Sequence, residues 1–124
     1  MTGLTFDTGA LIALERRQPR MRAVLEHAVA RDQPITVPAA VVAEWWRGRT
    51  DLRDAILETV DVEPLTLPLA KVAGTALAAV PSATLVDAVV MASAARRGDV
   101  VYSSDVDDLE RLRAYFPGVR VLGV

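Results

Sequence analysis

Short runs of apolar residues alternate along this chain with longer segments of helical periodicity, and this alternation constrains the fold most strongly. These runs are short and rich in apolar residues, which is typical of strands covered on both faces. Strands that alternate with helices predict an α/β domain with a mostly parallel sheet. We expect strands at 4–6, 35–37, 60–62, 100–102 and 119–122. We expect helices at 7–17, 20–31, 39–47, 52–59, 69–80, 84–97 and 105–115, with Pro19 closing the first.

The length of 124 residues predicts a single domain, 1–124, with a core that needs no disulfide or metal to fold. Hydrophobic residues make up 52% of the chain, which argues against disorder. Cysteine is absent, so disulfides, zinc–thiolate sites and a thiol nucleophile are excluded. Neither a secretory leader nor an apolar stretch of about 18 residues is visible, and we therefore expect a cytoplasmic protein.

The net charge of −2 argues against a general affinity for nucleic acid, but the basic residues are unusual in kind. Thirteen of the fourteen are arginine, and Lys71 is the only lysine. Arginine suits bidentate contact with phosphate better than lysine does. An arginine excess also reflects a GC-rich genome, so it is only a weak indication of nucleic-acid binding.

Two aspartates follow predicted strands. Asp7 comes directly after 4–6, and Asp105 follows 100–102 after two serines. Ligands of open α/β sheets bind at the carboxyl ends of the strands, so both positions suit a functional site. Both positions also suit a helix N-cap, and Asp108 lies three residues beyond Asp105, as in a capping box. Taken alone, each position leaves both interpretations open.

Two further acids lie in strongly apolar helical segments. Asp87 sits in the stretch 84–97, with capping-box spacing from Thr84, and Glu44 lies about two turns past Pro38, too deep to cap a helix. Burying a lone charged carboxylate is costly unless it is paired. The alternatives are a cap for Asp87, and an exposed stripe or a salt bridge to Arg47 or Arg49 for Glu44.

If these four acids converge, they cannot remain as an isolated cluster of negative charge. Two unit charges about 4 Å apart repel by about 4 kcal/mol at an effective dielectric constant of 20. The group must take up protons or bind a cation. The only histidine, His27, is expected on a helix surface, and an all-oxygen ligand set selects Mg²⁺ or Mn²⁺. Such a site activates water and neutralises charge on a phosphodiester, which is the chemistry of a nuclease.

Four segments of the chain, taken together and in order, resemble a PIN domain, and more narrowly a VapC-type toxin of a bacterial toxin–antitoxin pair. They are FDTGALIALE at 6–15, VVAEWWRG at 41–48, LVDAVVMASAARRG at 85–98 and VYSSDVDDLERL at 101–112. The resemblance implies a three-layer α/β/α sandwich with a short, mostly parallel sheet. It also implies a Mg²⁺-dependent endoribonuclease, in which Mn²⁺ can substitute.

The resemblance also assigns roles to individual residues. It implies that the catalytic, metal-binding quartet is Asp7, Glu44, Asp87 and Asp105, that Asp108 is a further metal ligand, and that Thr8 and Ser103 support the carboxylates. Two positions depart from the common pattern, because Gly9 stands where many relatives have serine and Ser103 where threonine is commoner. Asp107 is extra, and we expect it to be solvated.

The implied partners are a cognate small antitoxin, an RNA substrate and a second copy of the chain in a homodimer, with no membrane. Trp45, Trp46, Arg16 and Arg97 are candidates for contact with RNA or antitoxin. Core packing of one tryptophan, with the other partly exposed, is the alternative for the first pair. Solvated helix ends are the alternative for the arginines.

Three other functions remain to be weighed. A phosphoacceptor receiver domain also gathers aspartates at strand ends, but it needs paired acids after the first strand and a lysine late in the chain. A non-catalytic PIN-fold binding module would not need a complete acid quartet. A PIN-fold RNA-processing or repair nuclease outside a toxin–antitoxin system keeps the same chemistry, and only the chain's small size argues against it.

Overall fold

The computed structural model describes residues 2–124, and in that range it contains one five-stranded sheet whose strands are all parallel. The strands are β1 Leu4–Phe6, β2 Ile35–Pro38, β3 Asp61–Glu63, β4 Val100–Ser103 and β5 Arg120–Gly123. The helices are α1 Thr8–Glu15, α2 Pro19–Ala30, α3 Ala39–Trp45, α4 Asp51–Glu58, α5 Leu67–Ala79, α6 Leu85–Arg97 and α7 Val106–Arg113. The predicted α/β class is confirmed.

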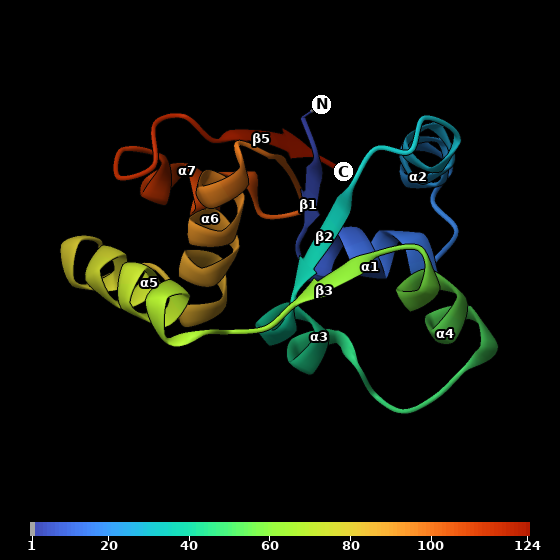
Figure 1. The fold of residues 1–124 in the computed structure, drawn as a ribbon, viewed down its shortest axis with the longest axis horizontal. Coiled ribbons are helices and arrows are strands. Elements are labelled where there is room, and N and C mark those ends of the chain that lie inside the picture. The colour runs from blue at the N-terminus through green and yellow to red at the C-terminus, as the bar shows by residue number, and fades with distance from the viewer. Residues whose placement is uncertain (1) are drawn as a thin grey trace.

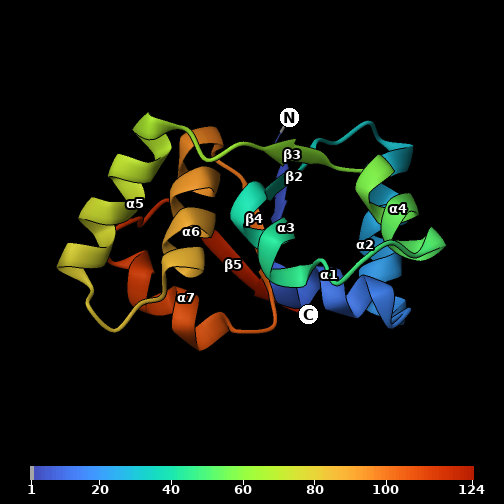
Figure 2. The same cartoon turned by 90° about the horizontal axis from the view of Figure 1, so that it is seen from below.

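Helices cover both faces of the sheet and complete three layers. Helix α6 crosses β1, β2 and β4 on one face, with α5 packed outside it and α7 beside it (Figure 1). On the other face α1 packs against β1 and β4, and α2 and α4 flank α1 (Figure 2). Within residues 2–124, no helix combines the length and the apolar character needed to cross a membrane.

The strand order β3-β2-β1-β4-β5 puts β1 at the centre of the sheet. The chain adds β2 and β3 on one side of β1 and then crosses over to add β4 and β5 on the other. The gap between β1 and β4 is therefore a topological switch point, where α/β sheets bind ligands at the carboxyl ends of the strands. Phe6 pairs with Tyr102 at that end, so the residues that follow each of them leave the sheet side by side.

Several predicted boundaries differ from the structure. Pro19 does not close the first helix, which ends at Glu15, but opens α2, because the missing N–H of proline costs nothing at a first helical position. The third and fifth strands begin one residue later than predicted, at Asp61 and Arg120. Both are edge strands, where polar side chains have access to solvent, so an apolar pattern does not mark their limits.

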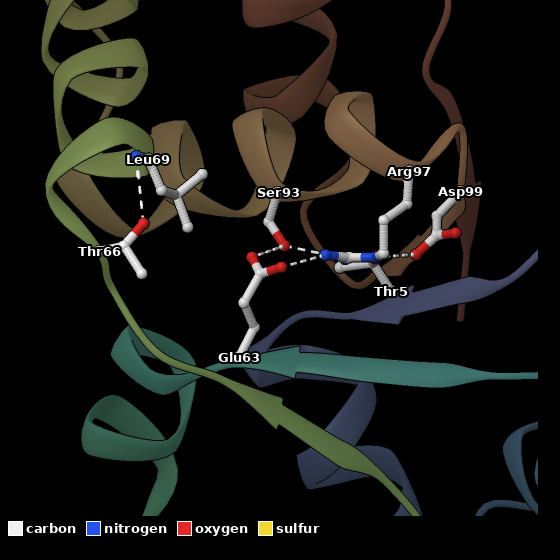
Figure 3. Close-up of polar contacts among 7 residues, drawn as sticks. All are labelled: Thr5, Glu63, Thr66, Leu69, Ser93, Arg97 and Asp99. Carbon is white, nitrogen blue, oxygen red and sulfur yellow. Dashed lines mark hydrogen bonds and ion pairs between the residues drawn. The ribbon is translucent and has the colours of Figure 1, made fainter.

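A polar network around Arg97 ties the edge strand β3 to the rest of the fold (Figure 3). The guanidinium donates to Glu63 of β3, to Asp99 at 2.9 Å and to the hydroxyls of Thr5 and Ser93 at 3.0 and 2.9 Å. Ser93 also donates to Glu63 at 2.8 Å, and Thr5 donates to Asp99 at 2.9 Å. The donors and acceptors of this network therefore satisfy one another under α6.

The prediction that Arg97 contacts RNA or antitoxin is consequently wrong for its guanidinium, which is committed to these internal partners and whose side chain is 26% exposed. The last turn of a helix gave no local sign of this, because Glu63 lies 34 residues away in the sequence.

We predict that Arg97→Met lowers the free energy of unfolding by about 2 to 4 kcal/mol, because it leaves the buried Asp99 carboxylate and the partly buried Glu63 carboxylate without their cation. Urea unfolding followed by tryptophan fluorescence measures the loss. Arg113→Met is the matched control, since the exposed pair of Arg113 with Glu110 contributes less than about 1 kcal/mol. Equal losses in both variants would contradict the assigned role.

Candidate active site

Asp7 is the buried member of the acid cluster, with only 5% of its surface exposed. Its backbone N–H donates to the Tyr102 carbonyl at 3.2 Å, which fixes it at the junction of β1 and β4. Its Oδ1 accepts from the Ala10 N–H at 2.9 Å and caps α1. Helix capping therefore accounts for one oxygen of the Asp7 carboxylate. It does not explain why this carboxylate is buried beside other acids.

Burial raises the pKa of the Asp7 carboxyl from 3.8 to about 6. Hydrogen bonds from the Ser103 hydroxyl and the Ala10 N–H act in the opposite direction and lower it, while the charges of Asp105 and Asp87 raise it further. Asp7 is thus poised between its neutral and charged forms near physiological pH. A neighbouring cation would favour the charged form.

Asp87 lies half-buried in the first turn of α6. Its N–H donates to the Thr84 hydroxyl at 3.2 Å, so Thr84 is the cap of this helix. The pKa of Asp87 is raised, first by burial and then by the charges of Asp108, Asp105 and Glu44, whereas hydrogen bonding with Thr84 lowers it. Together with Asp7, these interactions join all five predicted acids in one electrostatic cluster.

Asp105 occupies the N-cap position of α7, but its side chain makes no capping hydrogen bond. The Ser103 hydroxyl instead accepts from the Asp105 N–H at 2.8 Å. The capping-box alternative for Asp105 and Asp108 is therefore wrong, and the Asp105 carboxylate is exposed beside the cluster. Asp108, half-exposed one turn later, lies 3.5 Å from Arg111, while Asp107 is exposed as expected.

Glu44 reaches the cluster from the exposed side of α3. The Thr8 hydroxyl donates to Glu44 Oε1 at 2.5 Å and thereby ties α3 to the first turn of α1. The salt-bridge alternative is wrong, because Arg49 pairs with Asp51 and Asp54 and Arg47 donates to the Trp46 carbonyl. Glu44 is exposed, as the alternative of an exposed stripe requires. Its side chain is nevertheless held in place by Thr8, a residue that the resemblance to PIN domains assigns to the site.

The acids are close enough to shift one another's pKa, yet they are not gathered into a ready ligand set. Among residues 2–124, no group of three or more His, Cys, Asp or Glu side chains is arranged to hold a metal ion. The chemistry of the donors nevertheless fits a hard divalent cation, because all five are carboxylates. The raised pKa values of Asp7 and Asp87 are the electrostatic cost that a bound cation would relieve.

The two tryptophans differ in solvent exposure. Trp45 is 4% exposed, and its indole N–H donates to Glu15 at 3.0 Å, so it packs as the core alternative expects. Trp46 is half-buried and packs edge-on against Trp45, with ring centroids 6.2 Å apart.

Arg16 lies on an open groove next to the acids. The groove has a volume of about 460 Å³ and is lined by Ile12, Glu15, Arg16, Glu44, Trp45, Arg47 and Arg53. Of its basic residues, Arg53 is held by an ion pair with Glu15 at 2.7 Å. Arg47 was expected only as a possible salt-bridge partner of Glu44, and Arg53 and Glu15 were not expected at all. No local pattern marks Glu15, because its partners lie 30 and 38 residues away.

We predict that Asp7→Asn stabilises the protein at neutral pH. Between pH 4 and 6 the folded state holds a proton on Asp7 that the unfolded state has lost, so the stability of the wild type falls as pH rises through this range. The shift to about 6 corresponds to a cost of about 3 kcal/mol at pH 7, which the variant avoids.

Urea unfolding at pH 4.5 and 7.5, with a chelator present, tests this prediction. Asp51→Asn is the control, since the Asp51 side chain is 95% exposed and its loss should cost less than about 1 kcal/mol. A wild type and an Asp7→Asn variant with parallel pH profiles would show that Asp7 ionises normally.

Comparisons with known proteins identify the fold. No family model matches the sequence, and no curated protein matches it. Among solved structures, a chain of VapBC2 from Rickettsia felis, bound to a promoter DNA fragment, is 12% identical with a TM-score of 0.76, and 98% of each chain is covered. A chain of DNA-bound VapBC from Salmonella typhimurium is 17% identical, with a TM-score of 0.74 over 99% of this chain and 98% of that one.

A chain of FitAB bound to the IR36 DNA fragment is 18% identical, with a TM-score of 0.73 over 97% of this chain and 94% of the other. Identities this low establish a common fold rather than a common activity. The match extends over nearly the whole of each chain, so no large element is missing or added. The chain therefore has the PIN-like α/β fold present in these toxin–antitoxin complexes.

Proposed function

We propose that this protein is a metal-dependent endoribonuclease and the toxin of a toxin–antitoxin pair. One observation carries the proposal: the charges of Glu44, Asp105 and Asp108 act on Asp7 or on Asp87, so five carboxylates lie close together near the carboxyl ends of β1 and β4. A fold gains no stability from such a concentration of like charge. Its retention at a topological switch point therefore favours a catalytic role over the binding-module alternative.

Asp7, Glu44, Asp87 and Asp105 would hold the Mg²⁺ ion, with Asp108 at the edge of the site. The ion supplies a water of lowered pKa and neutralises charge on the phosphodiester. The chain's own residues prepare this chemistry. Burial of Asp7 provides an anchoring carboxylate away from solvent, and Thr8 and Ser103 restrict Glu44 and the turn that carries Asp105.

The toxin assignment rests on the complexes that share the fold. VapBC2, VapBC and FitAB were each solved as complexes, and a toxin–antitoxin complex from Klebsiella pneumoniae also matches, with a TM-score of 0.67. By analogy this chain would pair with a small antitoxin, form a homodimer and act in the cytoplasm. The DNA in those structures belongs to those complexes.

RNA is the proposed substrate, and the groove beside Glu44 offers a path for it. Arg16 and Arg47 line this groove and can contact phosphates, and the half-buried Trp46 lies next to it in the chain. Each arginine that contacts a phosphate adds affinity that weakens as salt is raised.

Cleavage of total cellular RNA by the purified chain tests the activity. We expect discrete fragments with Mg²⁺ or Mn²⁺, none with a chelator, and at least a 100-fold loss of rate in Asp7→Asn, Asp87→Asn and Asp105→Asn, on the order of the loss of a key charge-stabilising group. Glu44→Gln should fall in the same group. Asp107→Asn is the matched control, since this exposed acid lies one residue from Asp108 and should retain full activity.

Two outcomes would contradict the nuclease. Cleavage that survives in Asp7→Asn would exclude the acid cluster as its source. A pure, antitoxin-free protein that cleaves no RNA with either metal, while still binding a co-expressed partner, would favour the non-catalytic binding module. Cleavage without toxicity on expression in cells would instead favour a processing nuclease.

We predict that Arg16→Gln weakens RNA binding without lowering kcat. Fluorescence anisotropy with single-stranded RNA, in an Asp7→Asn background that prevents cleavage, should show a salt dependence less steep by about 0.7 in log–log slope. Arg31→Gln is the control. Arg31 lies at the C-terminal end of α2, which leads into the amino-terminal end of β2, whereas the acids lie at the carboxyl ends of the strands. An unchanged slope in Arg16→Gln would remove this residue from the RNA path.

A further inference from the structure

Gly9, in the first turn of α1, is in unusually close contact with Ser104, in the turn between β4 and α7. A Cβ atom placed on Gly9 would lie 1.9 Å from Ser104 Oγ, 2.6 Å from Ser104 Cβ and 3.0 Å from Ser104 N. Carbon atoms do not approach this closely without displacement. The space that a side chain at position 9 would need is therefore filled by Ser104.

Rotation of a side chain cannot relieve this overlap. The Ser104 hydroxyl can turn away, but its Cβ is fixed to the backbone, and the backbone N–H is part of the same contact. Any larger residue at position 9 must therefore push the 103–105 turn away from α1. Within residues 2–124, the Ser104 hydroxyl forms no hydrogen bond, so its close position is not explained by a polar interaction of its own.

The residues on either side of the contact belong to the acid cluster. Asp7 and Thr8 directly precede Gly9, and Ser103 and Asp105 flank Ser104. The turn is also tied down from the other side, where the Ser103 carbonyl accepts from the Val124 N–H at 3.0 Å. Moving Ser104 outward would therefore move Asp105 relative to Asp7.

We propose that Gly9 is a positioning residue: because it has no side chain, the Ser104 turn can lie against α1 and hold Asp105 next to Asp7. This inference rests on the proposed nuclease for its catalytic consequence, but the positioning itself is a property of the fold. Gly9 makes no contact with substrate and acts through Ser104. Displacements of about 1 Å in a catalytic group can cost roughly 100-fold in rate.

The test compares Gly9→Ala with Gly74→Ala and with the double variant Gly9→Ala/Ser104→Gly. Gly74 is an exposed glycine in α5 with nothing within 4 Å of its Cβ position, so the same substitution there should leave activity unchanged and raise the unfolding temperature. Gly9→Ala should lower kcat by roughly 10- to 100-fold with little change in KM, and weaken Mg²⁺ binding measured by calorimetry. Ser104→Gly removes the two closest atoms, so the double variant should recover most of both losses.

A second measurement does not depend on activity. In chelator, Gly9→Ala should lower the unfolding temperature of the wild type, whereas Gly74→Ala raises it, because alanine at position 9 overlaps Ser104. Ser104→Gly should restore most of this loss in the double variant. A wild type that neither cleaves RNA nor binds Mg²⁺ would refute the proposed function, while this comparison would still decide the positioning role.

The positioning role would be overturned by either of two results. The first is a Gly9→Ala variant that matches Gly74→Ala in kcat and in Mg²⁺ affinity. The second is a Gly9→Ala variant whose unfolding temperature in chelator is no lower than that of the wild type. A Gly9→Ala variant that is impaired but not recovered by Ser104→Gly would also count against it, because the loss would then arise from a contact other than Ser104.

Discussion

Parallel pairing of β1 with both β2 and β4 determines where every acid of the site can lie. Because Phe6 and Tyr102 are in register, Asp7 and the 103–105 turn both leave the sheet at the carboxyl ends of the strands. The carboxyl end of β2 leads directly into α3, which carries Glu44. Helix α6 crosses the three central strands and has Asp87 in its first turn. The site is a consequence of topology, and residues up to 98 positions apart in the sequence meet through it.

Gathering these acids works against folding, and the rest of the structure has to offset the cost. The shift in the pKa of Asp7 alone amounts to about 3 kcal/mol at neutral pH, a large fraction of the stability of a domain this size. Two internal polar networks brace the fold around the acids. Arg53 and Trp45 both bind Glu15 at the end of α1, and Arg97 joins β3 to α6 and β1.

The sequence predicted the fold class and all five strands because these follow from local patterns. It posed the convergence of the acids only as a condition. An apolar run marks a buried strand, and an acid directly after it must lie at the carboxyl edge of the sheet. The sequence did not predict the partners of Arg97 or Trp45, since a helix-end arginine looks the same whether it faces solvent or a carboxylate 34 residues away. The contact of Gly9 with Ser104 was also missed, because it depends on the final separation of two turns that no periodicity records.

The hydroxyl residues explain why helix capping does not account for the acids. Thr84 is the N-cap of α6 and accepts the N–H of Asp87, so a hydroxyl already caps that helix. Asp105 is the N-cap of α7, but its carboxylate makes no capping hydrogen bond, and its own N–H donates to the Ser103 hydroxyl. Asp7 does cap its helix, but with Oδ1 alone. If capping were the reason for these acids, their carboxylates would be engaged with backbone N–H groups. The carboxylates of Asp87 and Asp105 have no such partner, so they are left beside the other acids, as the proposed cation site would require.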